Sequence, residues 1–79
     1  MPDARIDITY EICPMTYVRV KLALEALPDG GVLEVRLKGA EPLKNVPRSA
    51  REDGHEVLSL DALPDGTSRL VLRAHHREG

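Results

Sequence analysis

Hydrophobic and polar residues alternate along two stretches of this chain, residues 5–12 and 32–38. In residues 5–12, isoleucines and one tyrosine fall on one side and charged or hydroxyl residues on the other. Residues 32–38, 55–60 and 69–74 also favour an extended chain. This period of two is typical of strands with one buried face. We therefore predict four strands.

Helical spacing replaces the alternation in the segment of residues 16–27. Pro14 suits the first helical position, where a missing N–H costs nothing. A turn at residues 28–31, rich in glycine, ends the predicted helix. The apolar residues that share one helical face are Tyr17, Val20, Ala23, Leu24 and Leu27.

A second helix is predicted within residues 41–53. Leu43, Val46 and Ala50 keep helical spacing, but Pro47 lies among them. A helix here either starts near Pro47 or is kinked by it. Gly54 suits a C-terminal cap.

The predicted element order is βαβαββ. Two amphipathic helices on one face of a four-stranded mixed sheet form a two-layer α/β sandwich, of the α+β kind. Seventy-nine residues leave room for one domain, which we expect to span residues 1–79. The outward residues of the first two strands are mostly charged or polar, so we expect the other sheet face to meet solvent. Residues 75–79 are expected to fray.

Composition narrows the function classes. The chain has no Phe or Trp, so its core must be aliphatic. A net charge of −2 with scattered basic residues argues against stable nucleic-acid binding. No apolar run approaches the roughly 20 residues of a membrane span, and the first residues are too polar for a secretory signal. A single cysteine cannot form an intrachain disulfide. We expect a cytoplasmic protein that does not bind membranes.

The single cysteine lies at the predicted start of the first helix. If Pro14 is the first helical residue, Cys13 is the N-cap, and the free N–H groups and partial positive charge of the helix face its sulfur. Met15 and Thr16 could supply backbone N–H groups to that sulfur. This setting favours the thiolate, which is the nucleophilic form. Free cysteines are also often small buried hydrophobes, and position alone leaves both interpretations open.

Three short motifs resemble those of one family. The run from Cys13 to Leu24 resembles the Cys-Pro-x-Pro helix start of the TusA (SirA-like) sulfur-carrier family. The segment Asn45-Val46-Pro47-Arg48, followed by Gly54-His55, resembles that family's Ile-Pro and Gly-His positions at matching distances. The βαβαββ order fits as well, so the resemblance covers nearly the whole chain.

The resemblance implies a persulfide sulfurtransferase. Cys13 would take a sulfane sulfur from a donor protein, such as a cysteine desulfurase or rhodanese, and hand it to an acceptor protein. Because the chain has no second thiol, release must involve another molecule. Thr16 stands where the family has a second proline, and it keeps an N–H that the sulfur can accept. We hypothesise that this variant holds the thiolate at least as firmly. Alternative functions on the same fold are a non-catalytic binding or regulatory module and a thiol redox sensor.

Four further residues of the first helix are candidates for partner binding. Val18 and Leu22 lie away from the main apolar face, as scattered surface residues or as a docking patch. We favour docking, because a carrier must present its sulfur to several partners. Arg19 and Lys21 are ordinary solvated charges by default. Alternatively, they guide an acidic partner toward the helix start.

Three histidines complete the set of candidates. His55 follows Gly54, and we expect a structural role, as a hydrogen bond that anchors the turn. The adjacent pair His75 and His76 could suggest a metal site, but adjacent residues of an extended chain point in opposite directions, and we expect this tail to be loose. No spacing of metal ligands and no glycine-rich phosphate loop is present, so we expect neither a metal nor a cofactor.

Overall fold

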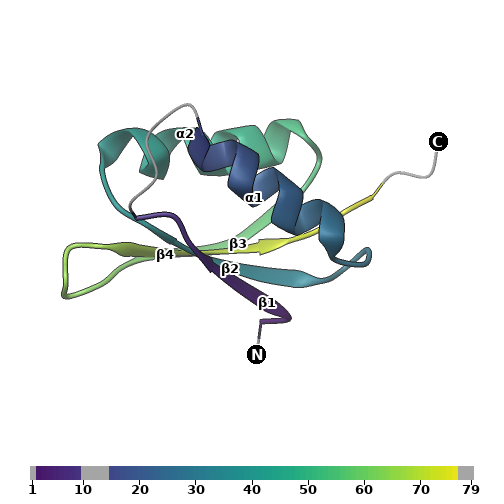
Figure 1. The fold of residues 1–79 in the computed structure, drawn as a ribbon, viewed down its shortest axis with the longest axis horizontal. Coiled ribbons are helices and arrows are strands. Elements are labelled where there is room, and N and C mark those ends of the chain that lie inside the picture. Colours follow the sequence, from purple (N-terminus) through teal and green to yellow (C-terminus); the bar gives the residue numbers. More distant parts are fainter. Residues whose placement is uncertain (1, 10–14, 77–79) are drawn as a thin grey trace.

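The computed structural model describes residues 2–9 and 15–76 (Figure 1). Its elements follow the predicted βαβαββ order. The helices and the last three strands agree with the predicted ranges to within two residues at either end. In chain order the elements are β1 (Ala4–Asp7), α1 (Met15–Ala26), β2 (Val32–Leu37), α2 (Ala40–Glu52), β3 (Glu56–Ala62) and β4 (Ser68–Arg73).

The strands form one mixed sheet in the order β1-β2-β4-β3. β1 pairs with β2 in parallel, because α1 crosses over between them, whereas β4 is antiparallel to both of its neighbours. Both helices cover the same face of the sheet (Figure 1). The two-layer sandwich with a four-stranded mixed sheet is therefore confirmed.

The core lies between the sheet and the helices, and the hydrophobic residues that the structure shows buried in it are all aliphatic, as the composition predicts. Alternation works as expected in β2, where every second residue is fully buried and the others are partly exposed. The predicted helical face is also confirmed: Val20 and Leu24 are fully buried, and Tyr17, Ala23 and Leu27 pack against the core. The remaining buried core residues are Ile8, Leu33, Val35, Leu37, Val46, Ala50, Leu70, Leu72 and Ala74.

Charged residues pair across the other face of the sheet. Each pair joins residues that are directly opposite on neighbouring strands. Such exposed pairs contribute less than about 1 kcal/mol each. The pairs are Arg5 with Glu34 (3.6 Å), Arg69 with Asp61 (3.7 Å) and Arg73 with Glu56 (3.7 Å).

The first strand is shorter than the alternation predicts. Oδ1 of Asp7 accepts hydrogen bonds from the N–H of Thr9 (2.9 Å) and from its hydroxyl (2.6 Å). This local turn takes the backbone out of the strand after Asp7. Ile8 is nevertheless buried, as expected for its side of the alternation. The end of the predicted strand, residues 10–12, lies outside the described residues.

α2 runs through Pro47 and does not start there. It begins at Ala40, so of the two alternatives offered by the sequence, a start near Pro47 is wrong, and the helix contains the proline. Pro47 cannot donate to the carbonyl of Leu43, but its ring is buried with Val46 and Ala50, and this packing offsets the lost hydrogen bond.

Gly54 caps α2, as predicted. Its φ of +91° places it in the left-handed region that favours glycine. Its N–H donates to the carbonyl of Arg51 (3.0 Å), and the N–H of His55 donates to that of Ala50 (2.9 Å). This is the Schellman pattern, which satisfies the last carbonyls of the helix.

The chain after β4 is held in place at its first residues. The expectation of fraying is wrong for His75 and His76, because both backbone N–H groups donate to side chains elsewhere in the fold. Residues 77–79 lie outside the described residues.

Candidate functional site

Helix α1 begins at Met15, two residues after Cys13 in the sequence. Met15 and Thr16 form the first residues of the helix, where backbone N–H groups have no partner within the helix. Cys13 and Pro14 lie outside the described residues. The N-cap position of the cysteine and the first helical position of the proline therefore stay predictions.

Packing fixes the position of α1 on the sheet. Val20 and Leu24 are fully buried beneath it. The hydroxyl of Tyr17 donates to Oδ2 of Asp53 (2.5 Å), just after the end of α2. Burial, reinforced by this hydrogen bond to a carboxylate, raises the pKa of Tyr17 well above its ordinary value. The first turns of α1 are thus tied to the end of α2, a contact that sequence reasoning missed.

Val18 and Leu22 are exposed on α1, as predicted. Their exposed fractions are 42% and 59%, which is high for large apolar side chains. They lie four residues apart, so they are neighbours on one helical stripe. Among residues 2–9 and 17–76, the remaining large hydrophobics that are exposed are Leu58 and Leu60 of edge strand β3.

Both basic residues of α1, Arg19 and Lys21, are exposed on the helix surface. Lys21 lines a hollow of about 310 Å³, together with Glu25 one turn further along the same helix. The role of Lys21 in attracting an acidic partner stays a prediction.

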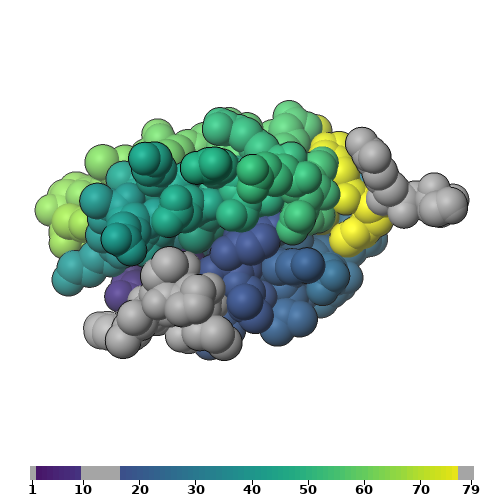
Figure 2. Space-filling model, turned by 90° about the horizontal axis from the view of Figure 1, so that it is seen from above, coloured from purple at the N-terminus to yellow at the C-terminus, as the bar shows by residue number. Residues whose placement is uncertain are grey.

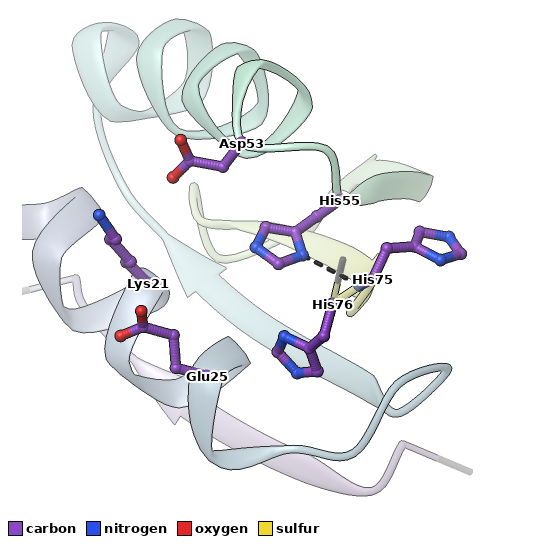
Figure 3. A pocket seen from close by; sticks show the side chains of 6 residues that line it. All are labelled: Lys21, Glu25, Asp53, His55, His75 and His76. Carbon is purple, nitrogen blue, oxygen red and sulfur yellow. Dashed lines mark hydrogen bonds between the residues drawn. The ribbon is translucent and has the colours of Figure 1, made fainter. Parts of the chain in front are cut away.

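The hollow lies between the second half of α1, the end of α2 and the chain after β4 (Figure 3). In the space-filling view, the C-terminal residues (yellow) lie beside the end of α2 (Figure 2). Every described residue that lines the hollow is ionisable. They are Lys21, Glu25, Asp53, His55, His75 and His76.

His55 has a structural role, as predicted. Its side chain, however, bonds to the chain after β4 and not to the turn at Gly54. Its Nδ1 accepts a hydrogen bond from the backbone N–H of His75 (3.1 Å; Figure 3). The contact follows from the register of the β3–β4 hairpin, which only the structure gives. Glu56 is opposite Arg73, so the residues just outside this pair, His55 and Ala74, must also be close.

Within the described part of the chain, no three or more His, Cys, Asp or Glu side chains form a group that could hold a metal ion. The same residues contain no helix that is long and apolar enough to cross a bilayer.

Comparison with known proteins identifies the family. The family model for sulfurtransferase TusA matches residues 4–74, and the chain belongs to this family. A relative from Archaeoglobus fulgidus is 41% identical over 68 residues, which cover 86% of this chain and 77% of the relative. One from Methanocaldococcus jannaschii is 37% identical over 69 residues, which cover 87% of this chain and 91% of the relative. YedF of Escherichia coli K12 is 35% identical over 60 residues, which cover 76% of this chain and 78% of YedF. All three carry the name "putative sulfur carrier protein".

A solved structure shares the fold. The SirA-like protein from Desulfitobacterium hafniense superposes with a TM-score of 0.79 and covers 92% of this chain and 99% of its own. The two sequences are 24% identical, so this likeness bears on the fold alone. The family model and these relatives agree on the TusA family.

Proposed function

We propose that this protein carries sulfane sulfur as a persulfide on Cys13 and passes it to a partner protein. The observation that carries the proposal is membership of the TusA family, together with a cysteine that is the single thiol of the chain and comes two residues before α1. The partners are a donor, such as a cysteine desulfurase or rhodanese, and an acceptor protein. We place this relay in the cytoplasm, without a cofactor or metal.

The chemistry consists of two exchanges at sulfur. The Cys13 thiolate attacks the outer sulfur of a donor persulfide, a new S–S bond forms on Cys13, and the donor cysteine leaves as a thiolate. A thiolate of the acceptor then attacks the outer sulfur, and Cys13 leaves. Neither step needs an external oxidant or reductant. Free N–H groups at the start of α1, those of Met15 and Thr16 among them, would stabilise the Cys13 thiolate as nucleophile and as leaving group.

The exposed stripe of α1 suits the docking step. Val18 and Leu22 offer apolar surface that begins within one turn of the helix start, and both are exposed. Arg19, exposed between them in the sequence, adds a charge that can select an acidic partner. Lys21 contributes less, because it lies beside Glu25 at the hollow.

Sulfur loading tests the proposal directly. The reduced protein is incubated with thiosulfate and rhodanese, or with cysteine and a desulfurase, and its intact mass is measured beside that of Cys13→Ser. A gain of one sulfur atom, about 32 Da, that is absent from the variant and reversed by thiol supports the carrier. Folded protein that loads from neither donor would favour the non-catalytic binding module. Loading without onward transfer to any protein thiol would favour the redox sensor.

The residue at the family's second proline position gives a finer test. Thr16 keeps a backbone N–H that proline would remove, so Thr16→Pro should raise the pKa of the Cys13 thiol or leave it unchanged. The pKa follows from the rate of thiol alkylation as a function of pH. A lower pKa in Thr16→Pro than in the parent would contradict the suggested role of the Thr16 N–H.

A further inference from the structure

The chain after β4 is held to the fold by several separate hydrogen bonds. Ala74 exchanges two backbone bonds with the α1–β2 turn, to Gly31 (2.8 Å) and from Gly30 (2.7 Å). The N–H of His76 donates to Oδ1 of Asp29 (2.9 Å). Between these two attachments, the N–H of His75 donates to Nδ1 of His55. Only this last bond has a histidine ring as its acceptor.

The bond to His75 fixes the protonation state of His55. A ring nitrogen that accepts a hydrogen bond carries no proton, so neutral His55 holds its proton on Nε2. A second proton could only go to Nδ1, and the ring would then face the His75 N–H with a donor. The bond exists in the neutral state alone. His55 has an exposed fraction of 9%, so its ring itself is largely withdrawn from water.

The groups around His55 act on its charge in both directions. Burial comes first and lowers the pKa of His55, and the rings of His75 and His76 lower it further. Asp53, at the end of α2, and Glu25, on α1, favour the charged form and act against burial. Lys21 also lines the hollow and adds a positive charge from α1.

The rings of His75 and His76 do not lose their contacts in acid. Nε2 of His76 lies 2.6 Å from the carbonyl oxygen of Leu27 and can donate to it whether the ring is neutral or charged. The ring of His75 lies 3.4 Å from Glu56 and 3.8 Å from Asp29, so protonation creates ion pairs there. Acid therefore removes one attachment of this segment, the one at His55.

We propose that His55 is an acid-sensitive latch for the chain after β4: the neutral ring holds His75 in place, and the protonated ring releases it. On release, the backbone N–H of His75 turns toward water and the segment moves away from the charged ring of His55. The hollow, which His55, His75 and His76 line together, then opens on that side. Its shape depends on pH, although Ala74 stays paired with the α1–β2 turn.

Amide hydrogen exchange measured by NMR between pH 8 and pH 4.5 tests the latch. The protection of the His75 amide, corrected for the intrinsic exchange rate, should fall at least about tenfold as the ring protons of His55 titrate. The amide of Ala74, which donates to the carbonyl of Gly31, is the internal control and should stay protected. Unchanged protection of His75 through the His55 titration overturns the proposal.

Two variants separate the acceptor from the charge. In His55→Asn, the side-chain oxygen takes the place of Nδ1 as an acceptor that does not titrate, so the His75 amide should stay protected at every pH. His76→Gln keeps a donor toward Leu27 without the titrating ring and should leave the pH dependence in place. If His76→Gln abolishes the pH dependence, the latch is not His55. If His55→Asn does not fold, the exchange rates of the parent protein still support or overturn the latch by themselves.

Discussion

Leu22 and Leu24 are identical side chains on one helix with opposite surroundings. Leu24 is fully buried in the core, whereas 59% of Leu22 is exposed. Truncation to alanine removes the same atoms at both positions. The pair therefore separates the contribution of α1 to stability from its proposed contribution to docking.

Leu24→Ala should strongly destabilise the fold. Removal of a fully buried leucine costs about 2–5 kcal/mol, because apolar contacts are lost and a cavity remains. For 79 residues, the whole free energy of unfolding is only about 4–12 kcal/mol. The variant should lose a large part of it, and its thermal midpoint should fall by roughly 10 °C or more.

Leu22→Ala should leave the free energy of unfolding within about 0.5 kcal/mol of the parent value. Its effect should instead appear in sulfur transfer. If Leu22 is buried against a partner, kcat/KM for transfer should fall about fivefold, which corresponds to about 1 kcal/mol of docking energy.

Urea denaturation, followed by circular dichroism, and a transfer assay with a desulfurase donor measure the two effects on the same samples. Similar losses of stability in both variants would refute the assignment of the buried face of α1. Unchanged transfer by Leu22→Ala would refute docking through the stripe of Val18 and Leu22.

Three further substitutions test single contacts. Tyr17→Phe removes the hydrogen bond to Asp53 and should lower the free energy of unfolding, measured by urea titration, by about 0.5–1.5 kcal/mol. In absorbance titrations, one tyrosine of the parent protein should ionise at an unusually high pH, and this transition should be absent from the variant. Because burial lowers the pKa of His55 below its ordinary 6.5, the unfolded chain binds this proton more tightly. The stabilising contribution of neutral His55 is therefore complete above pH 6.5 and is lost as the pH falls through the lowered value. His55→Asn should flatten this part of the stability profile, and an unchanged slope would contradict the assignment. Gly54→Ala places a side chain at φ +91° in open space, so the variant should lose about 1 kcal/mol of unfolding free energy through backbone strain alone. A thermal midpoint equal to that of the parent would argue against the role of Gly54 as the cap of α2.

Much of the architecture could be predicted from local patterns. Alternation in residues 32–38 predicts which side chains of β2 are buried, because a strand turns successive residues to opposite faces. The face of Val20 and Leu24 follows in the same way from helical spacing. Gly54 marks the end of α2, because few other residues adopt its backbone conformation. The early end of β1 also has a local cause, the turn between Asp7 and Thr9. The alternation of residues 5–12 gave no sign of this turn, because it continues beyond it.

Contacts between distant residues needed the tertiary structure. Tyr17 and Asp53 are 36 positions apart, and His55 and His75 are 20 apart. Each pair meets only because helix ends and strand register bring two segments together. Pro47 is a further case that local sequence could not predict. A proline is disfavoured inside a helix, but its ring is buried in the core, and α2 runs through it. By itself the sequence determined the layers and the place of Cys13 before a helix, since these depend on short-range periodicity. The fold decided which ionisable groups share the hollow, because that depends on how the layers pack.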